Sequence, residues 1–215
     1  MNMGFSSRDS GFGKTRTPNP KPRIPNPESR IPNPKSQIPK TTMKDILEKA
    51  ARTKLVIFDV DGVLTDGSLF IGDDGQEYKA FNSRDGHGIK MLKKYGVEIA
   101  IITGRTSKVV EHRVANLGIA HVYQGAHDKL ACFRDLVAKL GIDPQDTAYV
   151  GDDVVDLPVM TQVGLAIAVQ DAHPFVKRHA HWQTPSCGGR GAGRDVCELL
   201  IEARGQLQAE LESYL

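Results

Sequence analysis

The sequence contains few cysteines and no long apolar run. Its three cysteines form no C-x-x-C pair, and their odd number argues against a disulfide framework. No apolar run approaches the ~18–20 residues that a membrane-spanning helix needs, and the first residues lack the apolar stretch of a signal peptide. These absences exclude a disulfide-stabilised secreted domain. We expect a cytoplasmic protein with reduced thiols and no membrane partner.

Positive charge is also scarce once the first 42 residues are set aside. Those residues carry eight Lys or Arg and two acids, whereas the other 173 carry 20 Lys or Arg and 24 acids. A mildly acidic body does not suit a nucleic-acid-binding protein, because contacts with phosphates need a basic face. We therefore predict no nucleic-acid partner.

Residues 1–42 differ in kind from the rest of the chain. Eight of the twelve prolines lie there, within repeats such as "RIPNPES" and "RIPNPKS". Proline favours extended backbone, and the segment has no apolar periodicity, so it cannot bury enough apolar surface to fold. We predict a disordered tail before a folded domain at 43–215. A Pro-rich partner ligand, a basic tether and a true start at Met43 remain open alternatives.

Residues 43–215 alternate between strand and helix patterns. The apolar runs at 54–59 and 97–103 are typical of strands buried on both faces of a parallel sheet. Further strands are predicted at 120–124, 147–151 and 165–169, and helices at 42–51, 85–95, 108–117, 130–140, 157–163 and from 194 onward. Such alternation predicts a doubly wound α/β fold, interrupted only by a hairpin at 68–81 with "GDDG" at its turn.

Polar residues gather where these strands end. They are Asp59 and Asp61 after the first strand, Thr103 and Arg105 after the second, Asp152, Asp153 and Asp156 after the fourth, and Lys129 at the start of the preceding helix. Ligands of open α/β sheets bind beyond the carboxyl ends of the strands. Carboxylates brought together there would repel one another and protonate, and Mg²⁺, which prefers oxygen ligands, would relieve the repulsion. We therefore predict Mg²⁺ as the cofactor.

The same residues suggest phosphoryl chemistry. Asp59 is a candidate nucleophile that could form an aspartyl-phosphate, and Asp61 a candidate general acid and base. Thr103 and Lys129 would hold phosphoryl oxygens and neutralise their charge. A lone Asp after a strand is commonly a helix cap and a lone Lys a surface residue, so the prediction depends on their order and spacing together.

Four stretches, "FDVDGVLTDG", "IITGR", Lys129 and "GDDVVD", resemble the motifs of the haloacid dehalogenase (HAD) phosphohydrolase superfamily. The resemblance implies a HAD-like Rossmannoid core with the catalytic roles given above. It also implies a metal site formed by Asp59, the backbone carbonyl of Asp61 and Asp152, supported by Asp153 and Asp156. Only the hairpin stands where this superfamily inserts cap domains, so we predict a capless enzyme whose site is covered by neighbouring subunits.

Longer stretches, including "GQEYKAFNSRDGHGIK", "YQGAHDKL" and "GGRGAGRDVCELL", resemble the capless 3-deoxy-D-manno-octulosonate 8-phosphate (KDO 8-phosphate) phosphatases. The resemblance implies a homotetramer that releases KDO and phosphate in lipopolysaccharide biosynthesis. It implies substrate binding by Asp61, Asn82, Ser83, Arg84, Asp85, Gly86, Lys90, Arg105, Arg113, Lys129 and Arg190. It also implies a mobile Gly-rich segment near 187–195 that closes over a neighbour's site, so we expect removal of 188–215 to slow turnover without abolishing it.

Three other functions remain open. A sibling enzyme would act on a nine-carbon 2-keto-3-deoxy sugar acid 9-phosphate, but "GGRGAGR" favours the eight-carbon substrate. A non-catalytic scaffold domain would lack Asp59 or Asp61, and both are present. A general sugar phosphatase or phosphomutase is the third alternative, although mutases of this superfamily generally carry a cap.

Overall fold

The computed structural model describes residues 41–215. These belong to the second of two units into which the chain divides, residues 37–215. The predicted disordered tail, apart from its last two residues, lies outside the described residues.

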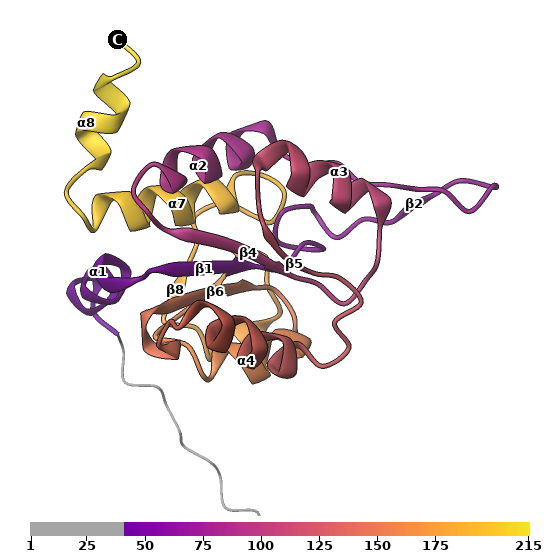
Figure 1. Cartoon of the computed structure of the whole chain (residues 1–215), viewed down its shortest axis with the longest axis horizontal. Helices are drawn as coiled ribbons and strands as arrows, with labels where there is room; N and C mark the ends of the chain where they lie inside the picture. The colour runs from indigo at the N-terminus through magenta and orange to yellow at the C-terminus, as the bar shows by residue number, and fades with distance from the viewer. Residues whose placement is uncertain (1–40) are drawn as a thin grey trace, which may run out of the picture. The chain divides into compact units, whose positions relative to one another are not determined.

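A six-stranded sheet forms the centre of the described unit, in the order β5–β4–β1–β6–β7–β8 (Figure 1). Every neighbouring pair is parallel. The strands are β1 (Leu55–Phe58), β4 (Glu98–Ile102), β5 (His121–Tyr123), β6 (Thr147–Gly151), β7 (Leu165–Ala168) and β8 (Trp182–Gln183). The parallel order confirms the predicted doubly wound fold. It also makes β1 and β6 neighbours, which decides where the candidate site lies.

Helices cover both faces of this sheet. They are α1 (Met43–Arg52), α2 (Ser83–Lys93), α3 (Lys108–Leu117), α4 (Lys129–Leu140), α5 (Leu157–Met160), α6 (Pro174–Lys177), α7 (Ala192–Glu202) and α8 (Leu207–Glu212). Figure 1 shows α2, α3 and α7 on one face and α4 on the other. The hairpin of β2 (Phe70–Ile71) and β3 (Glu77–Tyr78) projects away from the sheet. Among the described residues no cap domain covers the sheet edge.

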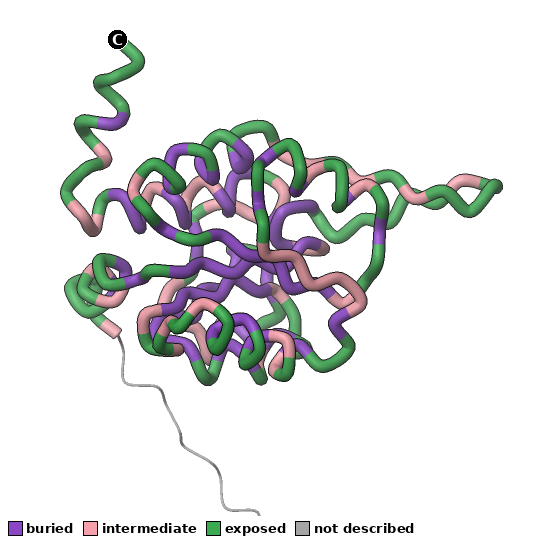
Figure 2. The backbone as a smooth tube through the Cα atoms, viewed as in Figure 1, coloured by how far each residue is buried: buried purple, intermediate pink, exposed green. Residues whose placement is uncertain are grey.

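Local sequence signals explain most of these boundaries. Helix α1 begins with a capping box between Thr42 and Asp45. Helices α3 and α4 end at Gly118 and Gly141, both at φ 62°, a left-handed conformation that glycine adopts without steric cost. All residues of β1, β6 and β7 are buried, as Figure 2 shows for the centre of the unit. Their continuous apolar runs therefore reflect burial on both faces.

The C-terminal part differs from the prediction. One helix was expected from residue 194 onward, but α7 ends at Glu202 and α8 begins at Leu207, with Gly205 at φ 67° between them. Strand β8 and helix α6 were not predicted, because two and four residues are too short to show a periodic pattern. No helix within residues 41–215 has the length and apolar character needed to cross a membrane.

Candidate active site

The two predicted metal-binding carboxylates lie at one edge of the sheet. Asp59 directly follows β1, and its backbone N–H donates to the Val150 carbonyl at 3.1 Å. Asp152 directly follows β6, the parallel neighbour of β1. The loop after β1 passes so close to Asp152 that a Cβ on Gly62, at φ 86°, would lie 2.2 Å from its Oδ2. Glycine is therefore required at position 62 to bring the two motifs together.

An open pocket of about 290 Å³ lies at this edge. It is lined by Asp59, Asp61, Gly67, Thr103, Gly104, Arg105, Lys129, Asp152, Asp153 and Val155. All residues predicted to act in catalysis are among them. Thr103, at the end of β4, is buried, and its N–H donates to the Tyr123 carbonyl at 2.9 Å. The structure therefore brings the residues predicted to act in catalysis into one pocket.

Lys129 bridges two carboxylates at the floor of this pocket. Its Nζ lies 2.8 Å from Asp59 Oδ2 and 2.7 Å from Asp156 Oδ1, and its side chain is 5% exposed. Burial alone lowers the pKa of this ammonium, but the charges of Asp59 and Asp156 outweigh burial and raise it. Lys129 therefore stays charged where a phosphoryl group would be neutralised.

Asp156 accepts hydrogen bonds from several groups around the pocket. Its Oδ1 accepts from Lys129 and, at 2.8 Å, from the Tyr149 hydroxyl. Its Oδ2 accepts from the backbone N–H groups of Asp152 at 3.0 Å and Asp153 at 3.2 Å. With both oxygens doubly occupied, Asp156 orients Lys129 and the turn after β6. The sequence did not predict a role for Tyr149 in the site, because a tyrosine inside an apolar strand is typical of a core residue.

The carboxylates of Asp59, Asp152 and Asp156 fit a divalent cation. Their oxygens lie within 4.8 Å of one another. Burial, and then the charge of Asp156, raise the pKa of Asp59 to about 6 and that of Asp152 to about 8. Burial and the neighbouring negative charge therefore both oppose ionisation of these two carboxyls, and Lys129 offsets only part of this. A hard cation with oxygen ligands would compensate that negative charge, and the oxygens still available are those of Asp59 and Asp152.

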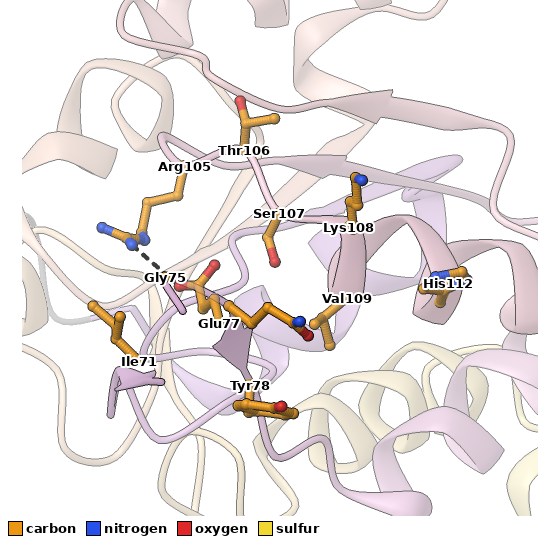
Figure 3. A pocket seen from close by; sticks show the side chains of 11 residues that line it. Ile71, Gly75, Glu77, Tyr78, Arg105, Thr106, Ser107, Lys108, Val109 and His112 are labelled. Atoms are coloured by element: carbon orange, nitrogen blue, oxygen red, sulfur yellow. Dashed lines mark hydrogen bonds and ion pairs between the residues drawn. The ribbon is translucent and has the colours of Figure 1, made fainter. Parts of the chain in front are cut away.

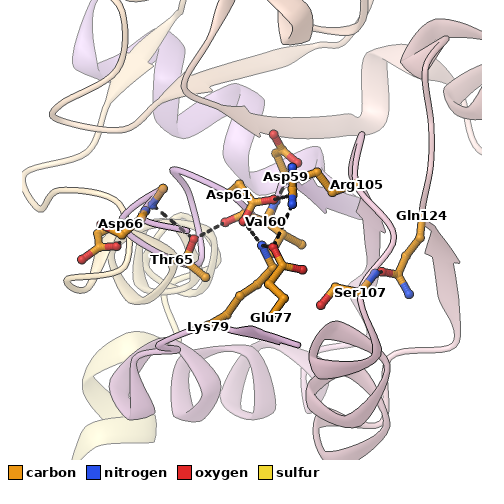
Figure 4. A network of polar contacts seen from close by, with 12 residues as sticks. Asp59, Val60, Asp61, Thr65, Asp66, Glu77, Lys79, Arg105, Ser107 and Gln124 are labelled. Carbon is orange, nitrogen blue, oxygen red and sulfur yellow. Dashed lines mark hydrogen bonds and ion pairs between the residues drawn. The ribbon is translucent and has the colours of Figure 1, made fainter. Parts of the chain in front are cut away.

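Asp61 enters a second polar network, which involves the hairpin (Figure 4). Its Oδ1 contacts Lys79 Nζ, and its Oδ2 lies 4.0 Å from Arg105 Nε. Lys79 Nζ and Arg105 Nη2 each lie 3.1 Å from Glu77 Oε1. Sequence reasoning missed Glu77 and Lys79, since "EYK" beside a turn is typical of a solvent-exposed hairpin.

Four of the residues predicted to bind substrate, Asn82, Ser83, Arg84 and Arg190, line a different pocket. This pocket, of about 360 Å³, is lined by Asp66, Ala80, Phe81, Asn82, Ser83, Arg84, Gly189 and Arg190. Arg190 Nη2 lies 3.1 Å from Asp66 Oδ2, and Asn82 Nδ2 donates to the Gly189 carbonyl at 3.3 Å. None of these residues lines the pocket of Asp59. The predicted catalytic residues and these predicted sugar-binding residues therefore line different pockets of the chain.

Four further residues predicted to bind substrate have other positions. Asp85 is 2% exposed, and its Oδ1 accepts from the Arg194 N–H at 2.9 Å, at the start of α7. Arg113 Nη2 donates to the Asn82 carbonyl at 3.1 Å, and a Cβ on Gly86 would lie 2.3 Å from that nitrogen. Within one chain, Asp85 therefore links the start of α2 to the start of α7, and Arg113 binds the residue before α2. Lys90 lies exposed on α2.

The Gly-rich segment predicted to be mobile is packed against its own chain. A Cβ on Gly188 would lie 1.8 Å from the Gly62 carbonyl oxygen, and one on Gly189, at φ 63°, 2.5 Å from the Asp66 nitrogen. The Ser186 N–H also donates to Asp195 Oδ2 at 2.8 Å. The segment therefore supports the loop after β1, which carries Asp59 and Asp61.

A pocket of about 760 Å³ lies between the hairpin and the start of α3 (Figure 3). Ile71, Tyr78, Ser107 and His112 are among the residues that line it. Arg105 lines both this pocket and the one that holds Asp59. The hairpin side of the candidate site is therefore open to a group larger than a phosphate.

The fold and this carboxylate-lined edge are those of haloacid dehalogenase-like hydrolases, and the model of that family matches residues 115–191. The chain is 53% identical over 163 residues to the 3-deoxy-D-manno-octulosonate 8-phosphate phosphatase of Escherichia coli, a match that covers 76% of this chain and 87% of that protein. It therefore belongs to the 3-deoxy-D-manno-octulosonate 8-phosphate phosphatase family, as the sequence motifs predicted.

Solved structures agree with this assignment. The crystal structure of the Yersinia pestis phosphatase of this family superposes with a TM-score of 0.75 at 49% identity, covering 76% of this chain and 89% of that one. The Moraxella catarrhalis phosphatase, in complex with magnesium ion, phosphate ion and KDO, superposes with a TM-score of 0.79 at 40% identity, covering 81% and 100%.

Proposed function

We propose that this protein hydrolyses 3-deoxy-D-manno-octulosonate 8-phosphate to KDO and inorganic phosphate in a Mg²⁺-dependent reaction. The observation that carries the proposal is the position of Asp59, which lies beside the Lys129 ammonium and Asp152 on the floor of an open pocket. A buried carboxylate with a cation beside it is arranged for attack on a dianionic phosphoryl group. Membership of the family names the substrate.

Two steps complete the reaction. In the first, an Asp59 oxygen bonds to phosphorus, the bond from phosphorus to the sugar oxygen breaks, and protonated Asp61 gives its proton to the leaving alkoxide. In the second, Asp61 takes a proton from water, whose oxygen bonds to phosphorus as the bond to Asp59 breaks. Thr103 and Lys129 hold the phosphoryl oxygens during both steps.

The proposed metal site consists of Asp59, the backbone carbonyl of Asp61, and Asp152, with Asp153 and Asp156 in support. Bound Mg²⁺ would neutralise negative charge between the phosphoryl group and the carboxylates. Asp156 acts by fixing Lys129 and the backbone of Asp152 through the hydrogen bonds described above.

We further propose a homo-oligomer, a tetramer by family resemblance, in which each copy completes another copy's site. Support comes from the pockets that these residues line: Asn82, Ser83, Arg84 and Arg190 line one pocket of the chain, and Asp59 lines another. Lys90 is assigned to the same sugar-binding surface. Exposed Phe70, Ile71 and Tyr78 on the hairpin offer apolar area for a subunit contact.

The proposed setting is the cytoplasm, and the proposed role is lipopolysaccharide biosynthesis, inferred from KDO as product. The odd number of cysteines and the lack of a C-x-x-C pair support a reducing compartment.

The first experiment measures phosphate release from KDO 8-phosphate and from the nine-carbon 2-keto-3-deoxy sugar acid 9-phosphate, with Mg²⁺ and with EDTA. We expect Mg²⁺-dependent release that favours the eight-carbon substrate, and loss of at least about 10³-fold in Asp59→Asn, whose amide is no nucleophile. Equal or reversed preference would indicate the nine-carbon sibling activity. Absence of release from both substrates would indicate a scaffold.

A further inference from the structure

We propose that Lys79 is a positioning residue that holds the Asp61 carboxylate in place for proton transfer. The hairpin of β2 and β3 would then contribute directly to the chemistry of the site. This inference rests on the proposed phosphatase function, because that function gives Asp61 its proton-transfer steps.

The hairpin directs two charged side chains toward the site. Side chains alternate along an extended chain, so Glu77 and Lys79 share one face while Tyr78, 59% exposed, lies on the other. Figure 4 shows Glu77 and Lys79 reaching from the hairpin toward Asp61 and Arg105. The hairpin therefore has a face that belongs to the active site.

The Lys79 side chain is fully buried, at 0% exposure. Long charged side chains are almost never buried unless they are paired, because the ammonium loses its hydration. Lys79 has two partners, Asp61 Oδ1 and Glu77 Oε1. By contrast, Lys139 also pairs with a carboxylate, that of Asp135 at 2.7 Å, but is 66% exposed. Burial distinguishes Lys79 from such a surface ion pair.

The Lys79 ammonium contacts only one of the two Asp61 carboxylate oxygens. Lys79 contacts Oδ1, whereas Oδ2 lies on the side of Arg105, whose Nε is 4.0 Å away. Asp61 and Arg105 both line the catalytic pocket. Glu77 binds Lys79 and Arg105 together, so the hairpin fixes the cations on both sides of the carboxylate. Without Lys79, Asp61 can rotate, and a misplacement of about 1 Å can cost about 10²-fold in rate.

A chromogenic substrate separates this role from general damage. With p-nitrophenyl phosphate, the bond from phosphorus to the nitrophenolate oxygen breaks without a proton, since nitrophenolate is a stable anion. Formation of the aspartyl-phosphate then needs no acid, while its hydrolysis still needs Asp61 to take a proton from water. A misplaced Asp61 slows only the second step, so nitrophenolate appears in a burst.

The experiment compares Lys79→Met, Lys79→Arg and the matched control Lys139→Met in rapid-mixing assays with Mg²⁺. We expect Lys79→Met to lower steady-state kcat by about 100-fold while the burst rate stays within about threefold of the wild-type first step. Lys79→Arg keeps the charge and should regain at least tenfold of the loss. Lys139→Met should behave as wild type.

A double-mutant comparison tests the link to Asp61 itself. In an Asp61→Asn background, Lys79→Met should change the residual kcat less than twofold, because its partner is already lost. A further loss of kcat in the double mutant as large as that in Lys79→Met alone would overturn the proposal. So would an equal fall of the burst rate and the steady-state rate in Lys79→Met, or wild-type rates in that variant.

Two further results keep the test decisive. If circular dichroism shows that Lys79→Met does not fold, Glu77→Gln replaces it; a threefold to tenfold loss with the burst retained supports the proposal, and no loss refutes it. Inactivity of the wild-type protein on every phosphate ester would refute the phosphatase function itself, a separate outcome from an active wild type whose Lys79 variants are unaffected.

Discussion

At the scale of single residues, the metal-binding part of the site balances crowded carboxylates against the buried ammonium of Lys129. Lys129 touches Asp59 and Asp156, whereas Asp152 has no cation of its own among the ion pairs of the described residues. Burial and the charges of Asp156 and Asp59 accordingly raise the pKa of Asp152 to about 8. The metal-free protein therefore carries an unfavourable group that a cation would stabilise.

This balance predicts a pH-dependent stability. The folded pKa of Asp152 is about 8, above its ordinary value of 3.8, so between these values the folded state holds a proton that the unfolded state has released. Stability of the metal-free protein should fall as pH rises through this window. Asp152→Asn removes the ionisable group and with it this loss of stability at high pH. At pH 8 we therefore expect the free energy of unfolding of the metal-free variant to exceed that of the wild type by about 1 kcal/mol or more, roughly 2–4 °C in Tm.

Thermal unfolding at pH 5 and pH 8, with EDTA and with Mg²⁺, measures both effects. Mg²⁺ should raise the Tm of the wild type at pH 8 and leave that of Asp152→Asn nearly unchanged. Equal pH slopes in the two metal-free proteins would contradict the assignment.

The sequence predicted the residues of the catalytic pocket because each follows a strand or begins a helix in a recognisable motif. Asp59, Thr103, Lys129 and Asp152 do converge on one pocket. Tyr149 and Lys79 could not be predicted, since their roles depend on partners from other parts of the chain. Their sequence neighbourhoods, a core strand and a hairpin, indicate burial and exposure respectively, and for Lys79 that indication is wrong.

At the scale of elements, α7 changes the interpretation of the C-terminal part. The sequence suggested a mobile segment followed by one helix, but α7 packs along α2 and buries Val196, Leu200 and Ile201 completely. Short apolar patterns do not reveal which face they will cover. The sequence therefore predicted a helix here but not its place in the core.

Removal of residues 188–215 should therefore prevent folding, which corrects the expectation of a mild loss. Burial of three large side chains contributes about 1.5–3 kcal/mol each, a large part of the ~5–15 kcal/mol that stabilises an ordinary domain. Removal of 206–215 alone should leave the core intact and lower Tm by only a few degrees, through loss of the Glu210 contacts with Lys94 and Tyr95.

Circular dichroism and thermal unfolding of the two truncated proteins distinguish these outcomes. A folded, cooperative protein without residues 188–215 would show that α7 is dispensable, contrary to its burial.

At the scale of the whole molecule, we propose that residues 43–215 carry the catalytic function. The relatives match about three quarters of the chain, and the described residues contain the pocket of Asp59 and the pocket of Asn82 and Arg190. The Pro-rich segment lies outside the described residues, and its role is a matter for experiment.

Deletion of residues 1–42 tests that assignment. We expect kcat/KM on KDO 8-phosphate to stay within about twofold of the full chain, since no residue proposed for the site precedes Asp59. Size-exclusion chromatography with light scattering on both proteins shows whether assembly is also unchanged. A large fall in activity would assign the segment a function as a tether or partner ligand.

The packing of α7 on α2 also bears on synthesis by the ribosome. Helix α2, residues 83–93, emerges long before α7, residues 192–202. Until translation has passed α7, the face of α2 that α7 covers has no partner, and the nascent chain exposes apolar side chains to solvent. Contacts between segments so distant in sequence form late and leave aggregation-prone intermediates. We therefore expect this protein to complete folding only near the end of translation, with chaperones shielding α2 in the interval.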